Sequence, residues 1–270
     1  MLARTLRAMV SLTAVATLAA CDSSTGTTPT GQLTVRLTDA PSPSFQAATA
    51  YIRAVVLIRG GDTTGNRDTI LIAPAARAYD LFALTNGVTA ALGSLTVPTG
   101  SYTQLRLLVD SARVTLKAPL MFNDGSTTKL MTTPSAYQSG IKVVFGGPVN
   151  VVVGETILVV DFDVLRNFVT TGPAASPTGV LFKPVLHATV QNIASSIAGV
   201  VTPASANATV YAIISNDTVQ TAIADGVTGA YKLRFLPAGA YSVSAVGSGV
   251  AVTKTLTLRA SQDTTGVNFP

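Results

Sequence analysis

The residues best suited to chemistry in this chain of 270 residues are two aspartates two positions apart, Asp161 and Asp163. Residues with this spacing in a strand face the same side, so both carboxylates would project together. Two like charges that close repel each other unless they share a cation or one holds a proton. A hard cation such as calcium needs further oxygen ligands, which Asp39, Asp80 or Asp110 could supply. The pair is therefore a candidate metal site.

Two other interpretations of the pair stay open. In one, which we favour, one aspartate caps a short helix that begins at Val164 and the other meets Arg166. In the other, the paired carboxylates act on a glycosidic bond. The sequence has no Asp-x-Asp-x-Asp-Gly loop around the pair, which counts against a calcium-binding loop.

His187 is the single histidine of the chain. A Ser-His-Asp hydrolase would have to use it, but the sequence contains no Gly-x-Ser-x-Gly segment to present a nucleophile. His187 stands in the middle of a predicted strand, where we expect it to face solvent or a polar partner. One histidine and one cysteine are too few for a zinc site. The sequence therefore predicts no catalytic residue and no enzyme.

Cys21 is the single cysteine. Arg4 and Arg7 precede an apolar stretch over 8–18, which leads to Leu-Ala-Ala-Cys. A basic start, an apolar segment and a small-residue cleavage site form a secretory signal peptide, and the last four residues resemble the bacterial lipobox. That resemblance implies cleavage after residue 20 and acylation of Cys21. We therefore expect an exported lipoprotein, held by membrane lipid on the periplasmic or outer surface.

Charge and hydropathy narrow the range of partners. Removing residues 1–20 leaves 16 basic residues against 13 acidic ones, a net charge of +3 instead of +5. The basic residues are scattered singly, so there is no basic patch for nucleic acid. Charged residues make up 11% of the chain and the mean hydropathy is +0.45, which excludes a disordered polyampholyte. Apart from the calcium considered above, we expect no cofactor.

Short alternating strands dominate the sequence. Runs rich in Val, Thr, Ile and Leu, bounded by Gly, Pro, Asn and Asp, predict strands at 33–37, 102–109, 157–162 and 185–190. Helical spacing is confined to 81–92 and 164–169. Many short strands with closely spaced turns predict an all-β fold of two β-sandwiches.

We predict four segments along the chain. The signal peptide covers 1–20, and a polar, flexible tether covers 21–30. A first β-sandwich covers 31–191 and a second covers 197–270. The connector between them is too short to be a free linker.

One turn motif occurs in both predicted domains, as apolar-Pro-x-Gly-x-Tyr ahead of an alternating strand. The matched residues are Pro98, Gly100 and Tyr102 in the first copy and Pro237, Gly239 and Tyr241 in the second. Proline fixes φ at one turn position and glycine supplies a conformation that other residues resist. The tyrosine is expected to bury its ring and return its hydroxyl to the backbone, as in the tyrosine corner of sandwiches.

Several motifs in the first domain occur in the order of a known family. They are Leu37-Thr-Asp-Ala-Pro41, Tyr79-Asp-Leu81, Gly100-Ser-Tyr-Thr-Gln-Leu-Arg-Leu107, Ser139-Gly-Ile-Lys142, Leu158-Val-Val-Asp-Phe-Asp163 and Phe182-Lys-Pro-Val-Leu186. Over 31–190 the chain resembles the bacterial lipoprotein family known as domain of unknown function 4382. The resemblance implies no activity and assigns no catalytic residue.

The second domain resembles a different group of modules. Ile197-Ala-Gly-Val-Val, Thr209-Val-Tyr-Ala-Ile, Asp225-Gly-Val-Thr-Gly-Ala-Tyr231 and Leu236-Pro-Ala-Gly-Ala-Tyr241 follow the order of carboxypeptidase regulatory-like and Cna-B-like modules. Those modules are prealbumin-like sandwiches with an Ig-like topology. The resemblance implies a spacer or binding platform.

The sequence thus predicts a lipid-anchored envelope protein with a non-catalytic binding, scaffolding or display role. Its partner would be an envelope protein or a glycan, recognised by loops near 60–68, 123–128 and 170–180. The alternatives are a calcium-stabilised adhesion module, in which Asp161 and Asp163 bind the metal, and a glycan-active enzyme that uses the same two carboxylates.

Overall fold

The computed structural model describes residues 28–40, 42–59, 67–71, 76–132 and 138–270. Cys21, the predicted signal peptide, most of the tether and the loop segment 60–66 lie outside the described residues. Strands make up most of the described chain, so the all-β fold class is confirmed. Among the described residues there is no helix with the length and apolar character needed to cross a membrane.

The first unit ends at Val190 and contains thirteen strands. They are β1 (Thr30–Thr38), β2 (Phe45–Arg59), β3 (Arg67–Leu71), β4 (Arg77–Asp80), β5 (Ala90–Pro98), β6 (Gly100–Leu116), β7 (Thr128–Thr132), β8 (Ile141–Phe145), β9 (Val149–Val151), β10 (Glu155–Asp161), β11 (Phe168–Thr171), β12 (Gly179–Phe182) and β13 (Leu186–Val190). Within the described part of the first unit, helix is confined to the short turns η1 (Phe82–Leu84) and α2 (Val164–Asn167). A third turn, η2 (Gln191–Ile193), directly follows β13.

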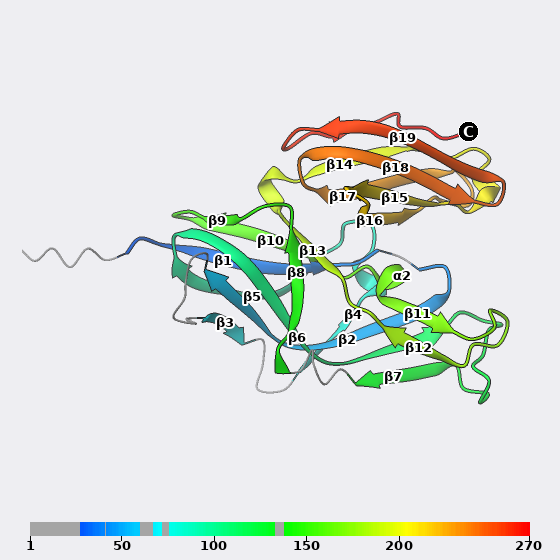
Figure 1. Cartoon of the computed structure of the whole chain (residues 1–270), viewed down its shortest axis with the longest axis horizontal. Coiled ribbons are helices and arrows are strands. Elements are labelled where there is room, and N and C mark those ends of the chain that lie inside the picture. The colour runs from blue at the N-terminus through cyan, green and yellow to red at the C-terminus, as the bar shows by residue number, and fades with distance from the viewer. Residues whose placement is uncertain (1–27, 41, 60–66, 72–75, 133–137) are drawn as a thin grey trace, which may run out of the picture.

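Eleven of these strands form one sheet, in the order β3-β2-β6-β8-β13-β10-β1-β5, with β4 beside β2 and with β7 and β9 beside β6. Two of its pairings, β1 with β10 and β13 with β8, are parallel. The remaining strands, β11 and β12, form a separate hairpin. The long strands β2 and β6 pair with each other along most of their length. Strand β2 also pairs with β3 and β4, and β6 with β7, β8 and β9, so the sheet curves around its core as a single hydrogen-bonded structure (Figure 1).

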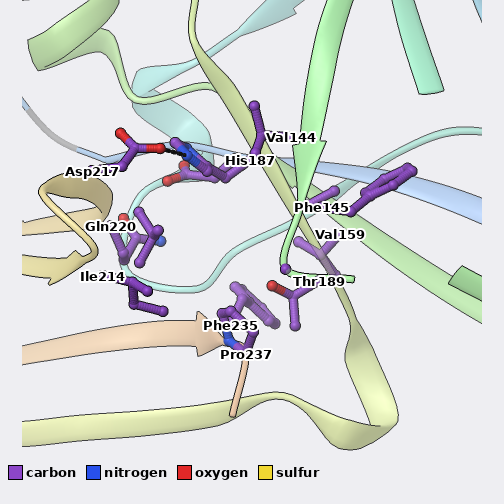
Figure 2. A pocket seen from close by; sticks show the side chains of 14 residues that line it. Val144, Phe145, Val159, His187, Thr189, Ile214, Asp217, Gln220, Phe235 and Pro237 are labelled. Atoms are coloured by element: carbon purple, nitrogen blue, oxygen red, sulfur yellow. Dashed lines mark hydrogen bonds and ion pairs between the residues drawn. The ribbon is translucent and has the colours of Figure 1, made fainter. Parts of the chain in front are cut away.

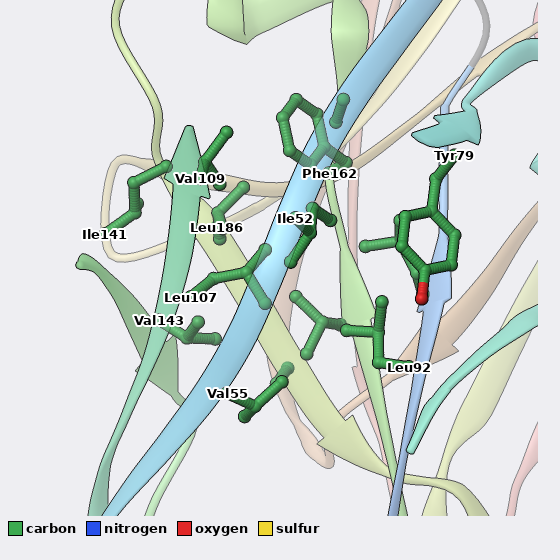
Figure 3. Packing of buried hydrophobic residues seen from close by; sticks show 14 of the residues in the cluster. Ile52, Val55, Tyr79, Leu92, Leu107, Val109, Ile141, Val143, Phe162 and Leu186 are labelled. Carbon is green, nitrogen blue, oxygen red and sulfur yellow. The ribbon is translucent and has the colours of Figure 1, made fainter. Parts of the chain in front are cut away.

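The core of the first unit lies inside this curved sheet. Figure 3 shows Ile52, Leu107, Val143 and Leu186 from different strands meeting there. Phe162, which directly follows β10, is fully buried in the same cluster and stacks near Phe168 and Phe182. Alternation along β10 sends Val160 and Phe162 inward. The intervening Asp161 therefore faces away from this core.

The second unit contains seven strands in two sheets. They are β14 (Ser195–Val200), β15 (Thr209–Ile214), β16 (Asp217–Ile223), β17 (Ala230–Leu236), β18 (Gly239–Gly247), β19 (Val250–Leu258) and β20 (Asp263–Thr264), with the turn η3 (Ala204–Ala206) after β14. One sheet has the order β17-β14-β20 and the other β16-β15-β18-β19. A separate hydrophobic cluster, from Ile197 to Phe269, fills the space between them. In Figure 1 this unit lies across the side of the first unit that carries β13 and α2.

The repeated turn has the same geometry in both units. Tyr102 is fully buried and its hydroxyl donates to the Pro98 carbonyl at 3.0 Å. Tyr241 is buried and donates to the Pro237 carbonyl at 2.7 Å. Each hydroxyl therefore satisfies a carbonyl four residues back, at the point where a long strand begins.

We expect Tyr241→Phe to lower the free energy of unfolding by about 1 kcal/mol, because the Pro237 carbonyl loses a buried hydrogen-bond donor while the ring stays in place. Urea unfolding measures this loss. Tyr211→Phe is the matched control, since Tyr211 is half-buried in the same sheet and its hydroxyl bonds to none of the described residues. Equal losses in the two variants would contradict a structural role for the turn.

Candidate functional site

Asp163 is the cap of the short helix α2. Its backbone has a left-handed φ of 47°, a conformation that aspartate tolerates better than most residues. Its side chain accepts a hydrogen bond from the backbone N–H of Arg166 at 3.2 Å. A second aspartate, Asp39, accepts from the backbone N–H of Val164 at 2.9 Å. The first turn of α2 is thus held by two carboxylates from distant parts of the sequence.

Asp161 occupies the last position of β10, directly opposite His187 on β13. Directly opposed residues share a face of the sheet, and Val159 with Thr189 is the next pair on that face. Asp161 is 6% exposed. The backbone N–H of Asp163 lies near its carboxylate, but within the described chain neither oxygen of Asp161 completes a hydrogen bond. This N–H and the charge of Arg166 offset the burial of Asp161 only in part.

Asp39, Asp161 and Asp163 form a buried acidic cluster, with exposures of 4%, 6% and 3%. Burial raises the pKa of Asp39 and of Asp161 well above the usual range, and the neighbouring carboxylates add to both shifts. Burial also raises the pKa of Asp163, to about 6, although the Arg166 guanidinium opposes the shift. Like charges this close in a dry environment favour protonation. The cluster therefore holds protons at a pH where an exposed aspartate is ionised.

A polar network joins the two units beside this cluster. We call it the junction network: Asp163, Arg166 and His187 from the first unit, and Asp217, Thr218 and Thr221 from strand β16. Arg166 donates to the Thr218 carbonyl and pairs with Asp217 at 3.3 Å. The Thr221 hydroxyl donates to Asp163 at 3.4 Å. One strand of the second unit is thus bound at three points along its length.

His187 makes its polar contact with Asp217, at 2.9 Å between Nε2 and Oδ2. The His187 side chain is 12% exposed. Partial burial alone would raise the pKa of Asp217. The hydrogen bond and charge of His187, together with Arg166, outweigh this effect and lower the pKa. Asp217 is therefore ionised at neutral pH. It lies at the start of β16, after a hairpin turn in which both Ser215 and Asn216 have positive φ.

A cavity of about 150 Å³ opens between the two units, next to this network. Figure 2 shows its labelled side chains converging from both sides, with the His187–Asp217 pair at one end. Val144, Phe145 and Val159 line it from the first unit, and the second unit contributes Ile214, Val219, Gln220, Phe235 and Pro237. Asp161 also lines this cavity. The lining is thus mainly apolar, with a few polar groups at one end, which is the usual character of a ligand site.

Phe235 reaches the cavity through an irregular backbone. It has a φ of 55°, which is uncommon for a bulky residue. It lies where the pairing of β14 and β17 shifts register between Ser195 and Ile197. Bulges of this kind redirect a side chain and are frequent beside functional sites. The strand thus turns an aromatic ring toward the junction.

The other predicted acidic ligands lie apart from this cluster. Asp80 accepts from the backbone N–H of Phe82 at the surface, and Asp110 pairs with Arg53 at 3.2 Å. Within the described chain there is no group of three or more His, Cys, Asp or Glu side chains arranged to hold a metal ion. The calcium role of Asp161 and Asp163 stays a prediction.

Several residues of the site carry no signal in the sequence. Asp217 and Phe235 belong to the second unit, and nothing in their local sequence links them to Asp161. Asn167 is fully buried, donates to the Phe162 carbonyl and accepts from the backbone N–H of Val185 at 2.8 Å, which fastens α2 to the following chain. A polar residue inside a predicted helix turn could have drawn attention to it, because buried amides need several partners.

The acidic cluster makes stability depend on pH. A carboxyl group whose pKa is raised by folding binds its proton more tightly in the folded state. Its protonation therefore adds to the free energy of unfolding in full below pH 3.8, the unfolded pKa, and this added stability is lost as the pH rises through the folded pKa. For Asp163 that loss is centred near pH 6. We expect the free energy of unfolding to fall by about 1 to 3 kcal/mol between pH 5 and pH 8. Urea unfolding across this range measures it.

Asp163→Asn should remove part of this dependence. Asparagine keeps the left-handed cap and cannot ionise, so we expect greater stability than the wild type at pH 8 and little difference at pH 5. Asp80→Asn, which changes a surface cap, is the matched control. A wild type that is as stable at pH 8 as at pH 5 would contradict the buried cluster.

A chelator tests the calcium prediction. Because no group of three or more acidic or histidine side chains among the residues described is arranged to hold a metal ion, we expect the melting temperature to be the same with and without a calcium chelator. Calorimetry of the purified protein gives the answer. A fall of several degrees in chelator, restored by calcium, would show that the pair binds the metal.

The solved structures that resemble this chain include three remote likenesses. The Bacillus anthracis TIE protein is 9% identical over 89% of this chain and 34% of its own length, with a TM-score of 0.22. A putative cell adhesion protein from Bacteroides fragilis is 11% identical over 86% of this chain and 91% of its own, with a TM-score of 0.16. The major pilin protein T-13 of Streptococcus pyogenes is 9% identical over 88% and 94%, also with a TM-score of 0.16.

This chain spans about a third of the length of the Bacillus anthracis protein. TM-scores this low carry no inference about its function. No curated protein matches the chain.

A family model does match. The model described as "Domain of unknown function (DUF4382)" covers residues 30–184, which is more than half of the chain and includes Asp39, Asp161 and Asp163. The family description assigns no activity to any of these residues. The chain therefore belongs to the family of domain of unknown function 4382.

Proposed function

We propose that this protein is a lipid-anchored envelope protein with a non-catalytic binding role, and that it presents its ligand site at the junction of its two units. The observation that carries the binding role is the cavity between the units, built by side chains from both and lined mainly by apolar groups. A site of this kind exists only while the two units hold one relative position.

The junction network supports that fixed position. Arg166 and His187 both engage Asp217, and Thr221 engages Asp163, so five side chains and the Thr218 carbonyl bridge the units. Hydrogen bonds to charged groups are stronger than neutral ones, especially when partly buried. The units therefore form a rigid platform, as a display or binding role requires.

The anchor rests on the sequence alone. Arg4, Arg7, the apolar stretch and Leu-Ala-Ala-Cys21 form the lipoprotein signal described above. Acylation at Cys21 would leave the short polar segment before β1 as a tether. Several acyl chains on one residue hold a protein stably on a membrane, so the binding site would stand a short distance from the lipid surface.

The geometry of the polar residues favours binding over catalysis. His187 is occupied by Asp217, and no described serine, threonine or cysteine side chain is hydrogen-bonded to it as a nucleophile. A glycosidase would need Asp161 and Asp163 open to a sugar, yet both are buried and Asp163 is engaged in a helix cap. The second unit, which resembles carboxypeptidase regulatory-like modules, would act as the other half of the platform.

Metabolic labelling tests the anchor. Cells that express the full chain and are fed an alkyne-bearing fatty acid should give a labelled protein in the membrane fraction. Cys21→Ser should abolish the label and leave the protein soluble or uncleaved, because no other thiol can be acylated. A second variant, Ser23→Ala, alters a neighbouring residue and should label normally. An unlabelled wild type with a free thiol at Cys21 would contradict the lipoprotein assignment.

A further inference from the structure

One end of the first unit contains the point where the chain enters β1, and we call it the entry end. The Thr99 N–H donates to the Pro29 carbonyl at 2.8 Å, so the chain is fixed to the turn between β5 and β6 before β1 begins. Only the eight residues 21–28 connect this point to the proposed lipid anchor. Eight residues reach at most about 28 Å when fully extended. An anchor at Cys21 would therefore keep the entry end close to the membrane surface.

The turn between β9 and β10 lies directly beside this point. The Gln32 N–H donates to the Gly154 carbonyl at 2.7 Å. Gly31 lies so close to Val152 that a Cβ atom at residue 31 would come within 2.0 Å of the Val152 carbonyl oxygen. Only glycine permits that approach. Figure 1 shows the start of β1 together with β9 at the left of the molecule, so the turn belongs to the entry end.

This turn exposes two neighbouring apolar side chains. Val152 is 56% exposed and Val153 is 73% exposed. The φ of 104° at Gly154 accounts for the glycine that follows them. Turn geometry does not account for the valines, because tight turns favour Gly, Pro, Asn, Asp and Ser. Single exposed apolar residues are ordinary on a protein surface, whereas adjacent ones at a turn indicate a contact surface.

The charged side chains described near the turn balance each other. Arg59, at the end of β2, donates to the Thr99 carbonyl at 2.6 Å. Glu155, the first residue of β10, accepts from the Thr34 hydroxyl at 2.8 Å. One positive and one negative group give little net attraction to a charged surface. Any affinity of the turn for a surface must therefore come from its valines.

We propose that Val152 and Val153 form a membrane-docking tip, which enters the bilayer at the boundary between headgroups and acyl chains. This inference deepens the proposed envelope role and rests on the lipid anchor. Two valine side chains bury too little apolar surface to hold a protein on a membrane alone. The anchor raises their effective concentration at the lipid surface, so a small gain suffices. Attachment at two points would give the body one orientation on the membrane.

A lipid surface suits this end better than a protein partner does. A specific protein interface buries about 1,000 Å² or more, far beyond two valines, and the short tether brings lipid to this end. Val169 and Leu181, which are opposite each other in the β11–β12 hairpin, form another exposed apolar pair, 41% and 46% exposed. Figure 1 places this hairpin at the opposite end of the first unit, so it is a matched comparison.

Tryptophan fluorescence tests the depth of the tip. The chain has no tryptophan, so an introduced one reports on a single position. The full chain with Val153→Trp is expressed, purified from the membrane fraction and reconstituted in phosphatidylcholine vesicles. Interfacial residues lie about 5–10 Å into the boundary between headgroups and acyl chains. We therefore expect stronger quenching by lipids brominated near the start of the acyl chain than by lipids brominated near its end.

Leu181→Trp is the control for this measurement, because it places the same indole on the exposed hairpin. Neither brominated lipid should quench it. Equal quenching of the two variants would show adsorption by tryptophan itself and would overturn the proposal. An unquenched Val153→Trp protein on the same vesicles would overturn it too.

A partition measurement tests the valines without added tryptophan. The chain 21–270 contains every residue that the structure describes, and its single thiol at Cys21 can be coupled to one acyl chain. A single chain binds membranes only marginally, so a contribution from the turn becomes measurable. The double variant Val152→Ser with Val153→Ser should partition about tenfold less into phosphatidylcholine vesicles, because two apolar side chains no longer leave water.

The double variant Val169→Ser with Leu181→Ser removes two apolar side chains at the other end and should partition like the wild type. Urea unfolding confirms that both double variants fold. Equal partition of the wild type and the Val152/Val153 variant would overturn the docking tip. Chemical coupling makes this result independent of acylation in cells, so an unlabelled Cys21 would overturn the anchor while the partition still decides whether the turn enters a bilayer.

Discussion

Burial of carboxyl groups between two sheets is the constraint on which the structure depends. The outer face of β10 and β13 carries Asp161 and His187, and the second unit covers that face. A covered carboxylate must be paired or protonated, because the energetic penalty for a lone buried charge is large. In the structure all three buried carboxyl groups, Asp39, Asp161 and Asp163, have a raised pKa. Backbone N–H groups of α2 also bond to Asp39 and Asp163.

This constraint links the fold to the proposed function. The inward face of β10 supplies Val160 and Phe162 to the core of the first unit, and this packing fixes the strand end that carries Asp161 and Asp163. Hydrogen bonds at α2 then set Arg166 at the junction. The second unit brings Asp217 and Phe235 to the same place, so neither unit alone encloses the cavity.

The sequence predicts the all-β class because alternation and turn residues are local signals, and the same is true of the short helix turn after Asp163. It also singles out Asp161 and Asp163, whose spacing is visible directly. It does not predict that the first unit is one continuous sheet with parallel pairs, because pairing is a non-local property. It likewise gives no sign of Asp217 or Phe235, which reach the site only through the packing of two units.

The most direct test of this account is the titration of the Asp161 side-chain carboxyl carbon by NMR, assigned by comparison with Asp161→Asn. The account predicts a pKa well above that of an exposed aspartate, because the second unit covers this carboxyl group. A carboxyl that titrates near pH 4, as in a model peptide, would contradict it.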